Sequence, residues 1–318
     1  MSNASPDQTP VPQVLVLLAA YNGAAWITTQ IESILAQEGV AVDIIVRDDR
    51  SRDDTAGVVA SEFSGNPRVR IVDAEQASGS AGANFRELIV AVDDADFDYV
   101  AFADQDDVWL PQKLRAAVDG LRRSGAAGYS GAVEAFWPNG RKQILGQDSR
   151  CREADFLFEG AGQGCTFVLS RELFFMTQRF INENPDACGN FHYHDWLVYL
   201  VARSAGAAWY FDPQVVMQYR QHEGNEIGAR GGWDAISKRL RLIRNGWYRR
   251  QLELSANLYL ATSRRSPQAT RLASLLVEAP KGRNLATRLK LFWWTMKWGR
   301  RRLSDRFVVA GAALAGWI

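Results

Sequence analysis

Four short apolar segments in the first third of the chain have the pattern of strands that are buried on both faces. They lie at residues 14–20, 42–46, 69–72 and 99–103. Each is followed by a segment in which apolar residues recur three or four positions apart, as Ile27, Ile31 and Ile34 do, and this spacing predicts an amphipathic helix. Repeated strand–helix alternation favours right-handed crossovers. We therefore predict an α/β fold with a Rossmann-like, mostly parallel sheet and helices on both of its faces.

The pattern changes after residue 124, where the strands become shorter and the order of elements becomes irregular. The elements predicted there are strands at 128–136 and 164–169 flanking a turn at 138–140, helices at 171–180 and 195–205, and a strand pair at 209–211 and 215–219. This order predicts a mixed-sheet half that belongs to the same domain.

A glycine-rich stretch at residues 224–232 predicts a flexible link, and beyond it the pattern is helical only. We therefore expect a disordered lead, a catalytic domain and a basic, tryptophan-rich helical extension. Their bounds are residues 1–12, 13–230 and 231–318, and the catalytic domain divides into a nucleotide-binding half at 13–124 and an acceptor-side half at 125–230.

Composition indicates a folded protein in a reducing compartment. The chain has 318 residues, of which 47% are hydrophobic, enough for a substantial core. Its three cysteines, Cys151, Cys165 and Cys188, form no CxxC pair, which disfavours a disulfide framework and a zinc site. No secretory signal and no apolar run of the roughly 18 residues that span a bilayer are visible. We expect a cytoplasmic protein, with peripheral attachment to the inner face of the cytoplasmic membrane as the further expectation.

The net charge of +1 conceals a strongly basic C-terminal segment. Residues 238–302 contain 17 Lys and Arg against two acidic residues, Glu253 and Glu278. Apolar residues in this segment and just after it recur at helical spacing, at Leu285, Leu289, Phe292, Met296 and Leu303. Two interpretations stay open: the helices pack on the catalytic domain or a second subunit, or they bind an anionic membrane surface. No nucleic-acid motif accompanies the charge, so nucleic-acid binding is disfavoured.

The strongest candidate chemistry is the acidic sequence Asp104-Gln105-Asp106-Asp107 after the fourth strand. Carboxylates at Asp104 and Asp106 can share a divalent cation and leave coordination positions for phosphate and water. Such a cation would make a diphosphate a better leaving group. The alternative is an Asp-rich turn that only begins the next helix. Ligands bind beyond the carboxyl ends of strands in open parallel sheets, and this location favours the cation site.

Three further groups of residues are candidates for contact with substrate. Asp48 and Asp49 follow the second strand and can accept hydrogen bonds from a base or ribose, or simply shape the loop. Asp195 can act as a general base or as a helix N-cap. Arg220 can hold phosphate oxygens and His222 can join the metal, although both fit an exposed basic strand end equally well.

These motifs together resemble the GT-A glycosyltransferases of the second sequence family, and within it the rhamnosyltransferase-like branch that builds O-antigen and capsular glycans. The matching stretches are residues 18–23, 47–55, 84–85, 103–109, 164–167, 194–196 and 219–225. Each is weak alone, but they follow the family's order over roughly residues 12–230. The resemblance implies a nucleotide-diphosphate sugar donor linked to dTDP or UDP, Mg²⁺ or Mn²⁺ as cofactor, and inversion at the anomeric carbon. It favours L-rhamnose as the sugar and a glycan or lipid-linked glycan as acceptor.

The resemblance also implies roles for individual residues. Asp195 is then the catalytic base, and Asp104, Asp106 and His222 are metal ligands. The donor-binding residues are Ala20, Tyr21, Asp48, Asn84, Asp104 and Arg220. Arg50 departs from the family, which commonly has glycine at this position of the turn. A residue other than glycine is strained at positive φ, so the turn is expected to differ.

Two other functions are alternatives for a chain with these motifs. A sugar nucleotidyltransferase would need a Gly-rich, Lys/Arg-containing loop after the first strand, and residues 21–25 lack that character. The remaining alternative is a catalytically silent donor-binding or scaffold protein on the same fold. For either function, association into a homo-oligomer is a further expectation.

Overall fold

A computed structural model describes residues 10–93, 96–146, 150–222, 241–262, 265–278 and 284–318. The predicted lead at 1–12 and the link at 224–232 fall largely or wholly outside these residues, and so does the boundary at 230/231. Elements are β1 Gln13–Ala20, α1 Ile27–Leu35, β2 Ala41–Asp48, α2 Thr55–Phe63, β3 Val69–Asp73, α3 Ala81–Ala91, β4 Tyr99–Asp104, β5 Val108–Trp109, α4 Lys113–Ser124, β6 Gly128–Phe136, β7 Lys142–Leu145, η1 Asp155–Leu157, η2 Gly164–Thr166, β8 Val168–Ser170, α5 Arg171–Glu183, α6 Pro185–Gly189, α7 His194–Ser204, β9 Trp209–Arg220, α9 Trp247–Thr262, α10 Pro267–Glu278, α11 Leu285–Trp298 and α12 Leu303–Ala315.

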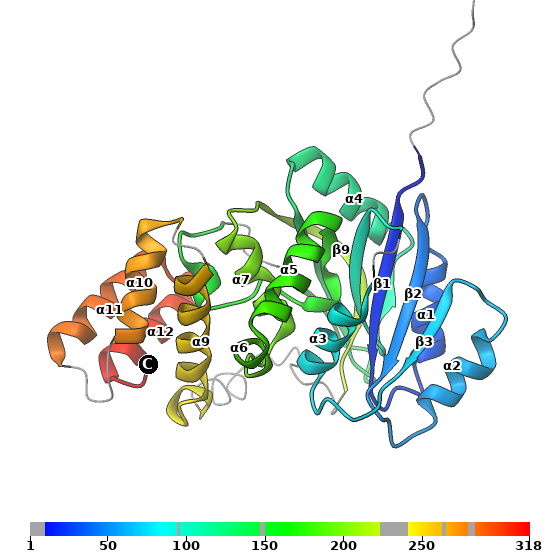
Figure 1. Ribbon diagram of the computed structural model, residues 1–318, viewed down its shortest axis with the longest axis horizontal. Coiled ribbons are helices and arrows are strands. Elements are labelled where there is room, and N and C mark those ends of the chain that lie inside the picture. The colour runs from blue at the N-terminus through cyan, green and yellow to red at the C-terminus, as the bar shows by residue number, and fades with distance from the viewer. Residues whose placement is uncertain (1–9, 94–95, 147–149, 223–240, 263–264, 279–283) are drawn as a thin grey trace, which may run out of the picture.

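One nine-stranded sheet forms the centre of the molecule (Figure 1). Its order is β3-β2-β1-β4-β8-β6-β9-β5, with β7 paired to β6. The first four strands in this order are parallel to one another. Beyond β4 the sheet is mixed, because β8 is antiparallel to both β4 and β6 while β9 is parallel to β6. The predicted α/β fold, with a mostly parallel sheet, is therefore confirmed, and the sheet is parallel in its first part and mixed in its second.

Helices cover both faces of the sheet, and β1 shows why. Alternate side chains of a strand point to opposite faces, and all of Val14–Ala20 is buried. Val14, Val16 and Leu18 pack in one cluster with α1 and α4. Leu15 and Leu17 pack in the other, with α3, α5 and α7. A strand in the middle of two such layers must be apolar along its whole length.

Two local predictions for the second half were wrong. The predicted strand pair at 209–211 and 215–219 is one strand, β9, which stays paired with β6 across register shifts at Gly131 and Ala132. The shifts accommodate Pro213, which cannot donate a ladder hydrogen bond. The turn at 138–140 joins β6 to β7, and residues 164–166 form a single 3₁₀ turn rather than the start of a strand.

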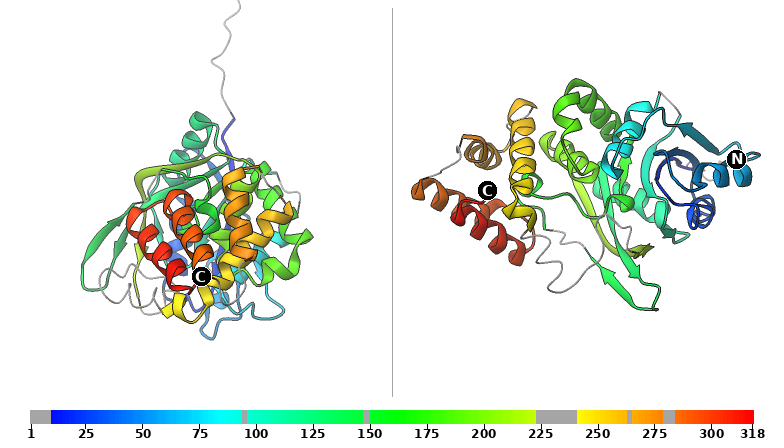
Figure 2. Two further views of the ribbon diagram at one scale, coloured as in Figure 1. Left: turned by 90° about the vertical axis from the view of Figure 1, so that its left-hand side faces the viewer. Right: turned by 90° about the horizontal axis from the view of Figure 1, so that it is seen from below.

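The C-terminal helices pack side by side at one end of the molecule, and α9 contacts α7 and η1 (Figure 2). Leu252, Leu272 and Leu291 from this part belong to the same buried cluster as Leu15 of β1. A buried ion network also joins the two parts: Asp155 lies within 3.1 Å of Arg203 and 3.4 Å of Arg301. Packing of the basic helices on the catalytic domain is therefore confirmed for the described residues.

Candidate active site

The carboxyl ends of β1, β2 and β4 meet at one edge of the sheet. In the register of the parallel strands, Ala20 lies beside Asp48 and Ala19 beside Asp104. Three residues that were predicted from separate motifs are thus brought together. Parallel pairing alone achieves this, because each strand ends where its motif begins.

The loops after β1 and β2 are joined by hydrogen bonds. The Asn22 and Gly23 amides donate to the side-chain oxygens of Ser51 and Thr55, both at 2.8 Å. The Asn22 side chain in turn accepts from the Arg52 amide at 2.8 Å. Tyr21 is 44% exposed beside this junction. The arrangement presents the Tyr21 ring to solvent at the strand edge and fixes the backbone beneath it.

Asp48 closes its own loop. One carboxylate oxygen accepts from the Ser51 amide at 2.9 Å, and the other accepts from the Ser51 hydroxyl. Ser51 is therefore engaged by Asp48 and does not cap α2, whose N-cap is Asp54 without a side-chain cap bond. Arg50 adopts φ of 61°, in the left-handed region that glycine favours. The turn thus keeps a glycine-like conformation although arginine occupies it.

Asn84 is buried beneath the strand edge. Its amide nitrogen donates to the carbonyl oxygens of Ala20 and Arg47, both at 3.3 Å, and its oxygen accepts from Arg47 at 2.8 Å. Arg47 is also buried and pairs with Asp49 at 3.1 Å, while Asp49 accepts from the amides of Ser78 and Gly79. Asn84 and Asp49 therefore hold the loops in position, and neither presents its polar atoms at the strand edge as Tyr21 does.

The acidic loop after β4 receives Arg220 and His222 from the end of β9. Antiparallel pairing of β9 with β5 sets this approach. The Arg220 side chain donates from Nε to the Asp106 carbonyl oxygen at 2.8 Å, and its amide donates to Asp107 at 3.2 Å. His222 Nε2 lies 2.6 Å from the Asp106 carboxylate, and its ring stacks on Trp26 with centroids 4.4 Å apart. Motifs about 115 residues apart in sequence thus form one site.

The donor set of this loop fits a hard divalent cation. Among the described residues, ligand atoms of Asp104, Asp107 and Cys165 lie within 4.8 Å of one another. One carboxylate oxygen of Asp107 is buried without a hydrogen-bond partner there. Burial, with Asp106 and Asp104 nearby, raises the pKa of Asp107 well above its usual value. Burial also raises the pKa of the Cys165 thiol, which favours carboxylate over sulfur ligation.

A buried lysine lies behind the acidic loop. Lys113 donates to the Cys165 carbonyl oxygen at 2.6 Å, and its ammonium lies 3.2 Å from the Trp109 ring centroid. Burial lowers the pKa of Lys113 to about 7, opposed by the attraction of nearby acidic groups. Sequence reasoning missed this cation. The Trp-Lys pair four residues apart, with Trp109 at the end of β5 and Lys113 as the first residue of α4, is the signal that could have found it.

Asp195 lies in the first turn of α7, next to the 3₁₀ turn that carries Cys165. A Cβ atom at Gly164 would lie 3.1 Å from the Asp195 Cβ, so the two segments are in close contact. The N-cap of α7 is Tyr193, not Asp195, and the Asp195 carboxylate accepts from the adjacent Trp196 amide at 2.7 Å. The helix N-terminus favours its negative charge. The N-cap alternative for Asp195 is therefore wrong.

His194, the first residue of α7, packs beneath the helix start that carries Asp195. Its ring stacks on Phe85 with centroids 3.9 Å apart, and its buried Nε2 atom has no hydrogen-bond partner among the described residues. Burial, and secondarily Arg86, lowers the pKa of His194 to about 3, so the ring stays neutral. The imidazole acts as an aromatic core residue that fixes the start of α7.

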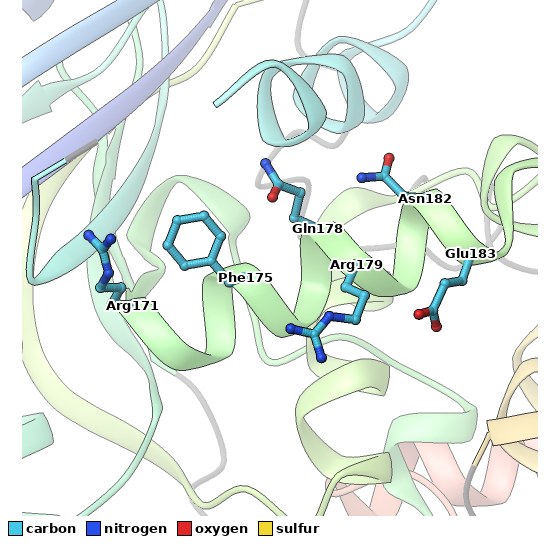
Figure 3. Close-up of a pocket in the computed structure, with 6 residues that line it drawn as sticks. All are labelled: Arg171, Phe175, Gln178, Arg179, Asn182 and Glu183. Carbon is cyan, nitrogen blue, oxygen red and sulfur yellow. The ribbon is translucent and has the colours of Figure 1, made fainter. Parts of the chain in front are cut away.

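A separate hollow lies along α5 and shares no lining residue with this site (Figure 3). Its lining residues come from α5 and are Arg171, Phe175, Gln178, Arg179, Asn182 and Glu183. Arg171 donates to the carbonyl oxygens of Asp98 and Phe97, at the amino-terminal end of β4. The hollow therefore begins at the end of β4 opposite to Asp104.

Comparison with known proteins agrees with this fold and shows the family. The model of the family described as Glycosyl transferase family 2 matches residues 15–204. The chain is 39% identical to the dTDP-rhamnosyl transferase RfbG of Shigella flexneri over 241 residues, 76% of this chain and 83% of that protein. The chain belongs to glycosyl transferase family 2, and the predicted rhamnosyltransferase-like resemblance is confirmed.

Two further similarities bear on the family and the fold. A protein of Escherichia coli named UDP-Glc:alpha-D-GlcNAc-diphosphoundecaprenol beta-1,3-glucosyltransferase WfgD is 30% identical over 163 residues, 50% of this chain and 61% of that protein. S. aureus TarS, solved in complex with UDP-GlcNAc, superposes with a TM-score of 0.53 at 14% identity, covering 96% of this chain and 89% of that one. A mannosyltransferase from Pyrobaculum calidifontis, solved with GDP-Man and Mn²⁺, gives 0.52 at 17% identity over 99% and 88%. These structures confirm the GT-A fold.

Proposed function

We propose that this glycosyltransferase moves L-rhamnose from a dTDP-linked donor to a glycan or lipid-linked glycan acceptor, with inversion at the anomeric carbon. The observation that carries the proposal is the assembly of the acidic loop with Arg220 and His222 at the edge where β1, β2 and β4 end. That edge is the general ligand-binding position of open α/β sheets. The name of the Shigella relative supports dTDP-rhamnose as donor.

We propose further that Asp104, Asp106 and His222 hold Mg²⁺ or Mn²⁺, with Asp107 as an additional carboxylate. The ligand atoms of Asp104 and Asp107 lie with that of Cys165 within 4.8 Å of one another, and a buried oxygen of Asp107 has no hydrogen-bond partner among the described residues, which supports a cation at this loop. Asp106 and His222 are in direct contact with each other at 2.6 Å. The Pyrobaculum neighbour contains Mn²⁺. When bound, such an ion would neutralise charge on the diphosphate and improve it as a leaving group.

The chain's own residues then have distinct tasks. Arg220, fixed by its Nε bond to the Asp106 carbonyl oxygen, stabilises diphosphate oxygens. Ala20, Tyr21 and Asp48 line the nucleotide side, and Asn84 positions the Ala20 and Arg47 backbone rather than contacting the donor itself.

Asp195 takes the proton from the acceptor hydroxyl, which attacks the anomeric carbon from the face opposite the diphosphate. Its place at a helix start, rigidly packed against Gly164, keeps the carboxylate oriented for that step. Chemistry of this kind leaves the sugar with inverted configuration, because a single displacement occurs.

The acceptor is proposed as a saccharide, free or linked to a lipid. WfgD is named for a diphosphoundecaprenol-linked acceptor, which supports the lipid-linked form. Neighbouring structures hold UDP-GlcNAc or GDP-Man, so the fold is compatible with more than one nucleotide base.

Donor binding should be measured first, by thermal shift with dTDP-, UDP- and GDP-sugars in Mn²⁺, Mg²⁺ or EDTA. Wild type is compared with Asp106→Ala and with Asp43→Ala, which removes an exposed carboxylate at the other end of β2. We expect metal-dependent stabilisation by dTDP-rhamnose in wild type and Asp43→Ala, lost in Asp106→Ala. No stabilisation by any donor, in folded protein, contradicts the proposed site.

Asp195→Asn separates binding from transfer. We expect this variant to bind donor like wild type and to lose at least a hundredfold in transfer rate, as general-base removal does. Wild-type protein that binds donor but transfers sugar to none of a panel of glycan and polyprenyl-diphosphate acceptors would favour the silent scaffold instead.

A further inference from the structure

The exposed side of α11 is apolar. Leu285, Leu289 and Trp293 follow one another at four-residue spacing and are 66%, 43% and 67% exposed. The opposite side of the helix carries Leu291 and Thr295, which are fully buried. The apolar residues of α11 therefore form two stripes, and only one of them packs on the protein.

The adjacent helix α12 repeats this arrangement. Phe307, Val308 and Leu314 are 57%, 44% and 39% exposed, while the other side of the helix buries alanines and Val309. Trp317, just beyond the helix, is 42% exposed. We call the large exposed apolar residues of both helices, together with Trp317, the α11–α12 surface; they are Leu285, Leu289, Trp293, Leu303, Phe307, Val308, Leu314 and Trp317.

The α11–α12 surface lies at the end of the molecule. The two helices pack against each other, and Figure 2 shows them at the end opposite β3 and α2. Single exposed apolar residues are common on protein surfaces. A group of large apolar side chains on two neighbouring helices is not, and such a group marks a binding surface. No helix among the described residues is long and apolar enough to cross a bilayer.

Charge identifies the partner. α11 contains no acidic residue, and its exposed side includes Lys290 and Lys297 among the apolar residues. Arg302 is exposed at the start of α12, where the acidic residue of the first turn, Asp305, lies 3.8 Å from Arg300. Protein–protein interface cores are depleted of lysine, whereas anionic lipid headgroups attract it.

We propose that the α11–α12 surface docks on an anionic lipid bilayer. Both helices lie in the plane of the membrane, with leucine, phenylalanine and tryptophan in the headgroup and acyl boundary and lysines at the phosphates. Trp293 and Trp317 suit this depth, because an indole places an apolar ring and a polar N–H at the interface.

Vesicle flotation of the full chain tests this docking. We expect binding to phosphatidylcholine vesicles containing phosphatidylglycerol, and at least tenfold weaker binding to phosphatidylcholine alone or at high salt. Trp293→Ser/Phe307→Ser and, separately, Lys290→Glu/Lys297→Glu should each reduce binding at least tenfold. All four positions are exposed, so the variants should keep the wild-type Tm.

Matched controls are Val90→Ser/Ile144→Ser, which remove exposed apolar residues elsewhere, and Arg68→Glu/Arg123→Glu, which reverse exposed charges on β3's approach and on α4. Both should bind vesicles like wild type. The proposal would be overturned if the wild-type protein did not bind anionic vesicles. It would also be overturned if Trp293→Ser/Phe307→Ser and Lys290→Glu/Lys297→Glu bound them as wild type does. A stable dimer in light scattering that Trp293→Ser/Phe307→Ser dissociates would overturn it too, because the occupant would then be a second copy. The assay measures binding without turnover, so it is independent of the proposed reaction.

Discussion

The neutral imidazole of His194 predicts a defined loss of stability in mild acid. Burial lowers the pKa of His194 to about 3, whereas its usual value is 6.5. The unfolded chain therefore binds a proton on this ring near pH 5 and the folded chain does not. The resulting stability is complete above pH 6.5 and is lost as the pH falls from 6.5 towards 3.

The size of this pH-dependent loss of stability depends only on protonation of the histidine in the unfolded chain. At pH 5, protonation of a histidine of pKa 6.5 stabilises the unfolded chain by about 2 kcal/mol, and at pH 7.5 by about 0.1 kcal/mol. The result is the same for any folded pKa below about 4. His194→Phe keeps an aromatic ring on Phe85 and removes the titration.

Urea unfolding at pH 7.5 and pH 5 measures this contribution. Between the two pH values, wild type should lose about 2 kcal/mol more of its unfolding free energy than His194→Phe does. Any packing cost of phenylalanine cancels, because each protein is compared with itself. Equal losses in the two proteins would show that the folded ring is protonated in mild acid and would refute the assignment of His194 as a neutral core residue.

Two further predictions concern stability. Asp155→Asn should lower the unfolding free energy by about 3 kcal/mol in urea titration, because it leaves the charges of Arg301 and Arg203 partly uncompensated in a buried network. Glu153→Gln, at an exposed position two residues away, should lower it by less than about 0.5 kcal/mol. Similar losses for the two variants would contradict a stabilising role of the network. Arg50→Gly should raise the Tm, because it increases the unfolding free energy by about 0.5 to 1 kcal/mol by relieving an arginine held at φ of 61°. A lower Tm would mean that contacts of the Arg50 side chain stabilise the fold by more than its backbone strain destabilises it.

Local patterns determined the first half of the fold. Apolar runs with helical segments between them predicted β1 to β4 and their parallel order, because such strands have no solvated face. The same reasoning placed Ala20, Asp48 and Asp104 at strand ends, and parallel pairing then required them to be neighbours. The second half was less predictable: β9 contains a proline and changes register with β6, so its one strand was predicted as two.

Tertiary structure alone decided how the polar residues are used. Sequence could name Asp49 and Asn84 as candidate donor contacts, but their hydrogen bonds to backbone and Arg47 depend on loops packed from distant segments. It could not reveal the stacking of Trp26 on His222, nor the buried Lys113 behind the acidic loop. Along the tail, sequence predicted one apolar stripe that included Phe292 and Met296, whereas packing left Trp293 outside and covered Leu291. Helix α11 has apolar residues on more than one side, and only the elements that pack against it determine which side is exposed to solvent.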